Sequence, residues 1–160
     1  MTETLEAGDK APPFKLPRDG GDTISLASLK GKIVVLYFYP KDDTPGCTTE
    51  ALEFTAQRAK FSRAGAVVVG MSKDTVAKHD KFVAKHALKI ALASDEDGTA
   101  LDAYGVWVEK MNYGRKYMGI ERSTFLIDSK GKISQVWRKV RVKGHVDKVL
   151  EATKALAKES

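Results

Sequence analysis

The sequence predicts an α/β fold in which a mixed central β-sheet has helices on both faces. Apolar segments of strand length, such as Ile33–Tyr39, alternate with longer segments whose apolar residues recur at helical spacing. After these strand–helix units the chain has a hairpin pattern and one last helix. This order is typical of a mixed sheet rather than a purely parallel one.

The N-terminal part is predicted to hold a β-hairpin extension and then the central strand. Residues 14–31 place Asp19-Gly20-Gly21 between two short strand-like segments, and a turn follows at Lys30-Gly31. The strand Ile33–Tyr39 carries no charge, which is typical of a strand covered on both faces. Pro40 ends its pairing, because proline has no N–H to donate.

A helix is predicted from about Pro45 to Arg63, with Leu52 on its apolar side and Gly65 as the left-handed residue that stops it. Asp74 is the expected N-cap of the next helix. The segments that follow alternate between strand and helix: strand 66–72, helix 74–88, strand 90–96 and helix 98–106.

The C-terminal part is predicted to be irregular over 107–119 and to form a hairpin over 123–137, with its turn at 128–131. An amphipathic helix over 145–158 closes the chain. No repeat and no linker interrupts the sequence, so we expect residues 1–160 to form a single domain. The thioredoxin-like arrangement is the best-known fold with this order of elements.

The residue types present exclude several kinds of site. The single cysteine, Cys47, rules out an intramolecular disulfide and a cysteine-rich zinc site. His79 and His86, seven positions apart on a predicted helix, are expected at the surface, so no metal site is predicted. No glycine-rich nucleotide-binding loop is present, so we expect no cofactor.

The net charge of +6 raises the question of nucleic-acid binding. The lysines are scattered among acidic residues, however, and form no dense block with aromatic residues, so a solvated surface is favoured and no nucleic-acid partner is expected. The N-terminus lacks a signal-peptide pattern, and no apolar run reaches the length of a membrane span. A cytoplasmic protein without a membrane partner is therefore expected.

The position of Cys47 favours a reactive thiol. Thr44 suits an N-cap and Pro45 the first helical position, which puts Cys47 in the first turn, where backbone N–H groups lack partners and stabilise an anion. A free cysteine often only fills space. Here, however, Pro40, Thr44, Gly46 and Cys47 converge at the end of a buried strand, where α/β sheets usually carry their sites.

The segment "FYPKDDTPGCTTE" resembles the active-site segment of the peroxiredoxins, with its pattern Pro-x-x-x-Thr-x-x-Cys. Glu50 and the later "KYMGIERSTFLID" are similar to the bacterioferritin-comigratory, or peroxiredoxin Q, branch, and the likeness runs from "GDKAPPFKLP" to the last helix. The resemblance implies a thioredoxin-like fold with an N-terminal extension. It also implies that Cys47 is the peroxidatic cysteine, that the Thr44 hydroxyl contacts peroxide and sulfur, that Pro40 shields the pocket and that Arg122 lies near the thiolate.

The expected activity is that of a thiol peroxidase. Cys47 would attack a hydroperoxide, release water or an alcohol and become a sulfenic acid. Donors at the departing oxygen would stabilise the transition state, and Arg122, the Thr44 hydroxyl and the backbone N–H groups near Gly46 suit this role. Two alternatives stay open here: Arg122 could pair with a surface carboxylate such as its neighbour Glu121, and Glu50 could support the helix start or be a solvated residue.

The sequence departs from many members of this branch in having no resolving cysteine. Such members carry it five residues after the first, where this chain has Leu52, a residue expected to pack in the core. The resemblance therefore implies a single-cysteine (1-Cys) member whose sulfenic acid is reduced by an outside thiol. Thioredoxin, or glutathione with glutaredoxin, would serve, and we expect a monomer or a weak homodimer.

Two other functions compete with the peroxidase. A peroxide sensor would have its oxidised Cys47 read by a partner protein, and it would react once where a peroxidase turns over. A dithiol oxidoreductase is disfavoured, because the sequence has "CTTE" where that chemistry needs Cys-x-x-Cys.

Overall fold

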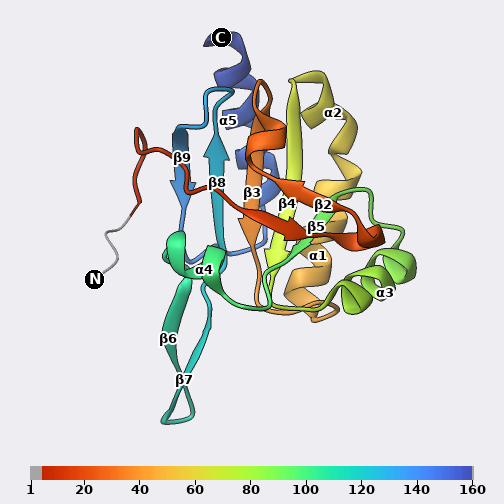
Figure 1. The fold of residues 1–160 in the computed structure, drawn as a ribbon, viewed down its shortest axis with the longest axis vertical. Helices are drawn as coiled ribbons and strands as arrows, with labels where there is room; N and C mark the ends of the chain where they lie inside the picture. The colour runs from red at the N-terminus through yellow and green to blue at the C-terminus, as the bar shows by residue number, and fades with distance from the viewer. Residues whose placement is uncertain (1–4, 160) are drawn as a thin grey trace.

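The structure is a computed structural model that describes residues 5–159 (Figure 1). Its strands are β1 (Lys15–Pro17), β2 (Thr23–Ser25), β3 (Ile33–Phe38), β4 (Ala66–Ser72), β5 (Ala91–Ser94), β6 (Trp107–Asn112), β7 (Arg115–Ile120), β8 (Ser123–Ile127) and β9 (Ile133–Trp137). Its α-helices are α1 (Pro45–Ala56), α2 (Arg58–Arg63), α3 (Val76–His86), α4 (Thr99–Ala103) and α5 (His145–Glu159).

A five-stranded mixed sheet organises these elements, as predicted. Its strand order is β5-β4-β3-β8-β9, with β3, β4 and β5 parallel and with β8 antiparallel to both β3 and β9. The predicted N-terminal hairpin (β1–β2) and the later hairpin (β8–β9) are both confirmed. Every residue of β3 is buried, which agrees with its uncharged sequence and its central place.

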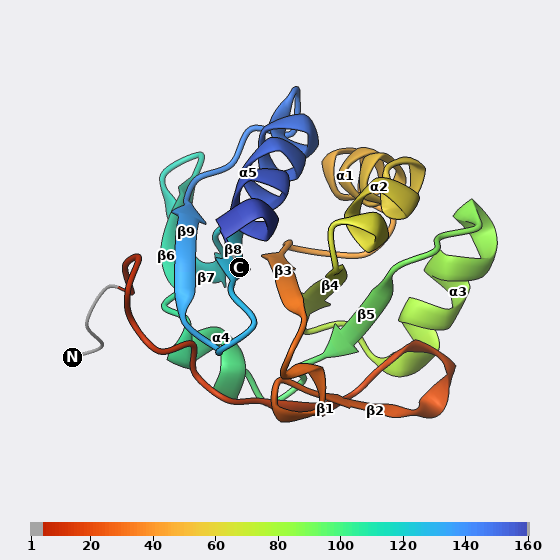
Figure 2. The ribbon, with the colours of Figure 1, turned by 90° about the horizontal axis from the view of Figure 1, so that it is seen from above.

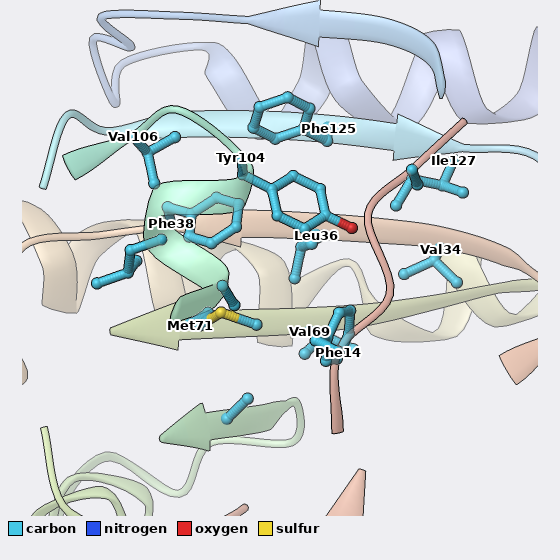
Figure 3. Close-up of a cluster of buried hydrophobic side chains, with 14 of the residues drawn as sticks. Phe14, Val34, Leu36, Phe38, Val69, Met71, Tyr104, Val106, Phe125 and Ile127 are labelled. Atoms are coloured by element: carbon cyan, nitrogen blue, oxygen red, sulfur yellow. The ribbon is translucent and has the colours of Figure 1, made fainter. Parts of the chain in front are cut away.

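The sheet separates two apolar layers, because successive side chains of a strand point to opposite faces. Figure 2 shows α1, α2 and α5 over one face and α4 with the β1–β2 hairpin over the other, with α3 beside β5. Val34, Leu36 and Phe38 face the α4 side and pack with Tyr104 and Phe125, as Figure 3 shows. The alternate residues of β3 face the other layer, which contains Cys47.

The predicted helix over 45–63 is two helices, α1 and α2, that meet at Gln57, where φ is −97° and ψ is 4°. Gly65 follows with a φ of 81°, as predicted. The expectation that Leu52 packs in the core is wrong, because its side chain is 41% exposed. The buried side of α1 is formed by Cys47, Glu50, Ala51 and Phe54, and at 100° per residue Leu52 points away from it.

The prediction of an irregular stretch over 107–119 is wrong. Residues in this region form the antiparallel β6–β7 hairpin. The hairpin extends beyond the sheet at the end where the β3 strand terminates (Figure 1). Tyr113 and Gly114 both have positive φ, as a two-residue hairpin turn of type I′ requires. Met111, Tyr113, Tyr117 and Met118 are exposed, so the hairpin lacks the alternation of apolar and polar residues that identifies a half-buried strand.

Two expectations about α3 are also wrong. The N-cap is Thr75, whose hydroxyl accepts from the backbone N–H of Lys78 at 3.2 Å, and not Asp74. His79 is fully buried, whereas His86 keeps partial exposure. Among the helices that the structure describes, none combines the length and the apolarity that a bilayer crossing requires.

Candidate active site

Cys47 lies in the first turn of α1, directly after the loop that leaves β3. Thr44 is the N-cap and Pro45 the first residue of the helix, as predicted. The thiol is 1% exposed and belongs to the apolar layer under α1. Its position in a turn whose N–H groups lack helical acceptors favours negative charge on the sulfur.

Arg122 contacts the Cys47 sulfur from a different segment of the chain. It precedes β8, and the pairing of Ser123 with Phe38 brings it to the end of β3. Its Nη2 donates to Cys47 Sγ at 3.3 Å, and its Nη1 donates to Glu50 Oε1 at 2.6 Å. The guanidinium therefore joins the thiol and a buried carboxylate of the same helix.

The geometry excludes one of the arrangements that the sequence left open for each of Arg122 and Glu50. The carboxylate partner of Arg122 is Glu50 and not the neighbouring Glu121. Glu50 is not a solvated helix residue, since it is fully buried. The Arg122 side chain is 16% exposed, so the pair is largely withdrawn from water.

Burial and charge shift the ionisation of these groups. Burial raises the pKa of Glu50 to about 7, against the lowering effect of Arg122. Burial lowers the pKa of Arg122, but the nearby Glu50 and Cys47 raise it by more, so its net pKa is raised. Arg122 thus keeps its positive charge beside the sulfur, while Glu50 changes its charge near neutral pH.

Gly46 lets the guanidinium come close. A Cβ at this position would lie 3.1 Å from Arg122 Nη2, which is tighter than ordinary packing allows. The backbone of Gly46 has no positive φ, so here the small side chain matters for space rather than for conformation. The glycine of the "TPGC" segment therefore has a steric reason that involves a residue far along the chain.

Thr44 and Pro40 are placed less directly. The Thr44 hydroxyl donates to the carbonyl of Lys41 at 2.8 Å. Pro40 is exposed and lines a pocket of about 410 Å³ together with Lys41 and residues of the β6–β7 hairpin. Cys47, Gly46, Glu50 and Arg122 are thus brought together by direct contacts, whereas Thr44 and Pro40 adjoin them along the chain.

Sequence reasoning missed several residues around this site. Lys110 of β6 lines the pockets beside Pro40 and beside Arg122, and burial and then the charge of Arg122 lower its pKa. The Tyr37 ring stacks on Phe54 of α1, with 4.6 Å between ring centroids. The sequence gives no signal for Lys110, because the pattern of its segment predicts irregular structure. Tyr37 has a weak signal, a hydroxyl in an otherwise apolar strand.

In the described part of the chain, Asp42, Asp74 and His79 are close enough to share a metal ion, with possible ligand atoms within 4.8 Å of one another. Their geometry fits hydrogen bonds instead. His79 Nδ1 lies 2.6 Å from Asp42 Oδ2, whereas two ligands of one zinc ion, each about 2.0–2.2 Å from it, stand about 3.3 Å apart. A proton and not a metal ion suits this pair.

The arrangement suits attack by sulfur on an electrophile that expels an anion. A thiol beside a cationic donor and free backbone N–H groups gains most when negative charge develops within reach of those donors. This condition is met when the sulfur attacks one oxygen of an O–O bond and the other oxygen leaves with the negative charge. The contact of Glu50 with Nη1 fixes the orientation of the Arg122 guanidinium, so that Nη2 points at the Cys47 sulfur.

Comparison with known proteins gives a consistent result. The sequence pattern described as the AhpC/TSA family matches residues 7–136. The chain is 48% identical over 156 residues to peroxiredoxin Bcp of Bacillus subtilis, covering 98% of this chain and 99% of that one. A structure of Xanthomonas campestris peroxiredoxin Q superposes with a TM-score of 0.87 at 48% identity, covering 90% and 91%. A Xylella fastidiosa PrxQ mutant gives 0.91 at 39% identity, covering 96% and 98%.

Proposed function

Since this chain belongs to the AhpC/TSA family, is a thioredoxin-like thiol peroxidase of the Bcp (peroxiredoxin Q) kind and has a single cysteine, we propose that it reduces hydroperoxides through a sulfenic acid on Cys47. The observation that carries this proposal is the 3.3 Å contact between Arg122 Nη2 and Cys47 Sγ. Hydrogen peroxide and organic hydroperoxides are the proposed substrates. We propose likewise that residues 1–160 form one domain.

In the proposed step, the Cys47 thiolate attacks the terminal oxygen of ROOH. The S–O bond forms as the O–O bond breaks, and RO⁻ leaves with the electron pair and takes up a proton to become water or an alcohol. Cys47 is oxidised to a sulfenic acid and the peroxide is reduced. Arg122 Nη2 and the N–H groups around Gly46 stabilise the charge on the departing oxygen.

The other site residues have supporting roles in this proposal. Because the Thr44 hydroxyl gives its proton to the Lys41 carbonyl, its oxygen is free to accept the O–H of the hydroperoxide. Pro40 covers the approach to the sulfur. Glu50 holds the guanidinium in place, and Gly46 leaves room for it.

Reduction of the sulfenic acid requires an outside thiol, because the chain has one cysteine. A first thiol attacks the sulfenic sulfur to give a mixed disulfide and water, and a second thiol then releases the Cys47 thiolate and a disulfide. We infer thioredoxin, or glutathione with glutaredoxin, as the donor, and a reducing compartment such as the cytoplasm. Cys47 is 1% exposed, so the first turn of α1 has to loosen before a thiol can reach it.

A coupled assay tests the proposal and identifies the donor. Peroxide consumption by wild type and by Cys47→Ser is measured once with thioredoxin and its reductase and once with glutathione and glutaredoxin. Wild type should turn over with at least one system, and Cys47→Ser with neither. Equal peroxide removal by the two proteins would overturn the proposed role of Cys47.

The lack of a resolving cysteine also favours a second candidate, a peroxide sensor. The oxidised sulfur would then persist until a partner protein reads it. Repeated turnover with either reductant supports the peroxidase. One oxidation per chain, with no further peroxide consumed when both reductants are present, supports the sensor.

A further inference from the structure

Helix α3 holds the loop that leads from β3 into α1 through two successive aspartates. His79 Nδ1 lies 2.6 Å from Asp42 Oδ2. About two helical turns further along the same face, His86 Nε2 lies 2.9 Å from Asp43 Oδ1. Lys85 Nζ lies 2.7 Å from the other oxygen of Asp43. The loop between Pro40 and Thr44 is therefore attached to an element that contains no residue of the proposed reaction.

The attachment through Asp42 is buried and extends to three strand ends. The Tyr39 hydroxyl donates to Asp42 Oδ1 at 2.5 Å, and the backbone N–H of Asp42 donates to Asp74 Oδ2 at 2.8 Å. His79 Nε2 lies 3.0 Å from the carbonyl of Ala93, at the end of β5. Asp42 is thus held on both carboxylate oxygens and on its backbone N–H.

The Asp43 attachment differs in its exposure. The side chains of Asp43 and Lys85 are 44% and 61% exposed, so this ion pair contributes little. Asp43 also has a φ of 61°, a conformation that costs energy for a residue other than glycine. The buried pair of Asp42 and His79 therefore carries most of the restraint on the loop.

The geometry requires a proton between His79 and Asp42. A carbonyl only accepts, so Nε2 bears the proton that it shares with Ala93, and Tyr39 gives its own proton to the other oxygen of Asp42. A contact of 2.6 Å between Nδ1 and Oδ2 then needs a second proton on the ring or on the carboxyl group. Without that proton, two lone pairs would face each other at hydrogen-bond distance.

The surroundings of His79 favour a positively charged ring. The charged groups that face it are the carboxylates of Asp42, from the loop, and of Asp74, from the segment between β4 and α3. The hydroxyl of Tyr39, the residue after β3, lies 3.5 Å from His79 Nδ1. Burial lowers the pKa of His79, and the hydrogen bond and charge of Asp42 raise it by more, so its net pKa is raised. Loss of the proton at higher pH removes the attraction that holds the loop to α3.

We propose that Asp42 and His79 are positioning residues for the peroxide reaction, which hold the Pro40–Thr44 loop, and through it the first turn of α1, in the arrangement where Cys47 meets Arg122. This inference rests on the proposed function. His79 touches neither sulfur nor substrate and acts through Asp42 and the loop. When its proton is lost, the loop loosens and the attack on peroxide slows, because Cys47 is no longer held against its donors.

The test uses two substitutions of His79 that separate charge from hydrogen bonding. His79→Leu removes both ring nitrogens, whereas His79→Asn keeps a neutral N–H donor at the position of Nδ1. The oxidation of Cys47 is followed by stopped-flow under single-turnover conditions, without reductant, from pH 6 to 9. His86→Asn, on the same helix but against the exposed Asp43, is the comparison variant.

We expect the wild-type rate constant, divided by the thiolate fraction measured by iodoacetamide alkylation, to fall at alkaline pH. His79→Leu should be slower by about tenfold throughout, and His79→Asn should recover most of the rate and lose the alkaline fall. His86→Asn should change the rate by less than about twofold. A merely structural histidine would not give an alkaline fall that disappears in His79→Asn.

Two further measurements keep the inference testable if a buried substitution prevents folding. Tyr39→Phe removes one donor to Asp42 with little change in shape, and it should move the alkaline fall to a different pH. Long-range ¹⁵N NMR of wild type should show both nitrogens of His79 protonated at neutral pH. An unprotonated Nδ1, or identical pH profiles in wild type and His79→Asn, would overturn the inference. Failure of the proposed function looks different, because wild-type protein would then consume no peroxide.

Discussion

Arg122 Nη2 lies 3.3 Å from Cys47 Sγ, although the two residues are 75 positions apart in the chain. The sheet creates this proximity. Cys47 follows the end of β3 by way of a short loop, and Arg122 precedes the strand that pairs antiparallel with β3. The pairing of β3 with β8 therefore brings the backbones of Cys47 and Arg122 close together.

Replacing Arg122 by lysine tests whether the planar guanidinium is needed. Lysine keeps the charge, but a single ammonium cannot bridge Glu50 and Cys47 with the fixed spacing of two guanidinium nitrogens. The expected result is a fall of about 10²- to 10³-fold in the second-order rate constant for peroxide, which is typical of losing one donor at a developing anion. Stopped-flow oxidation of Cys47 measures it.

The matched control is Arg141→Lys, since Arg141 is exposed and lies on the segment before α5. Its rate constant should equal that of wild type. If Arg122→Lys reacts within about threefold of wild type, the bridge between Glu50 and Cys47 has no catalytic importance.

Gly46→Ala tests the space left for the guanidinium. The added Cβ would lie 3.1 Å from Arg122 Nη2, so the guanidinium has to shift by a few tenths of an ångström from its position beside the sulfur. The peroxide rate constant should fall by about tenfold. Thermal stability should stay equal or rise, because alanine is a better helix former than glycine by up to about 1 kcal/mol.

Thr48→Ala, one residue beyond the cysteine in the same turn, is the control for Gly46→Ala, and it should alter neither quantity by much. The prediction holds only if Gly46→Ala lowers the peroxide rate constant without lowering the thermal stability. Equal losses of stability and rate in Gly46→Ala would point to general damage of the helix start instead of a displaced Arg122.

The local chemistry of the site was predictable because it depends on neighbours in sequence. Thr44, Pro45 and Cys47 carry their own signals for an N-cap, a first helical residue and a thiol in the first turn. The mixed sheet was predictable for a similar reason, since β3 and β4 are apolar runs of strand length. Each of these properties can be judged from a window of a few residues.

The remaining features depend on contacts between distant segments. His79 looks like a surface residue in a lysine-rich helix. Its burial depends on two partners distant in sequence, Asp42 and the carbonyl of Ala93, which lie 37 and 14 positions away. Glu50 likewise reads as a helix-surface carboxylate until Arg122 is placed beside it. Leu52 shows the reverse error. Its apolar side chain predicts a place on the buried side of α1, but its angle around the helix puts it on the exposed side.

Glu50 should make the protein less stable as pH rises. Burial raises its pKa from 4.5 to about 7, so the folded state holds the proton more tightly than the unfolded state. Its favourable contribution is therefore complete below pH 4.5 and is lost as pH rises through about 7, by about 3 kcal/mol in all. The variant Glu50→Gln cannot ionise and should lack this loss.

Urea unfolding at pH 4.5 and at pH 8 measures the effect. The stability of Glu50→Gln minus that of wild type should increase by about 3 kcal/mol between these two pH values. Glu96→Gln, at an exposed position, is the control and should show little change. A difference that is constant with pH would contradict the raised pKa of Glu50.

His145 should make the protein more stable as pH rises, which is opposite to the effect of Glu50 and covers nearly the same pH range. Burial, and then the charges of Arg122 and Lys148, lower its pKa from 6.5 to about 4, and its ring bonds to the Thr124 hydroxyl at 2.8 Å. The stability that neutral His145 provides is present above pH 6.5 and is lost as pH falls through about 4. The two groups therefore offset each other in wild type.

His145→Gln, which keeps a polar group near Thr124, should remove this acid-sensitive part. Its stability relative to wild type should be higher at pH 4 than at pH 7, as measured by urea unfolding. A relative stability that falls toward acid pH would mean that the folded state prefers the charged ring.

The single cysteine should leave the oxidised enzyme open to further oxidation. Without reductant, a Cys47 sulfenic acid has no thiol in its own chain with which to condense, and excess peroxide converts it to a sulfinic acid. Intact-mass spectra after repeated additions of peroxide should show two added oxygens on Cys47. Protein that stays free of this product under those conditions would contradict the prediction.

Leu52→Cys offers a matched gain-of-function variant. Position 52 is 41% exposed, so the substitution should cost little stability, and it lies five residues after Cys47. Five residues correspond to 500° around a helix, which leaves the two side chains about 140° apart, so a disulfide can form only if the first turns of α1 unwind. We expect the variant to form this disulfide after one equivalent of peroxide and to resist sulfinic acid formation. Leu52→Ser, with no thiol, should be as sensitive as wild type. If Leu52→Cys is overoxidised as readily as Leu52→Ser, then α1 stays folded after oxidation, and an outside thiol would have to reach Cys47 without that unwinding.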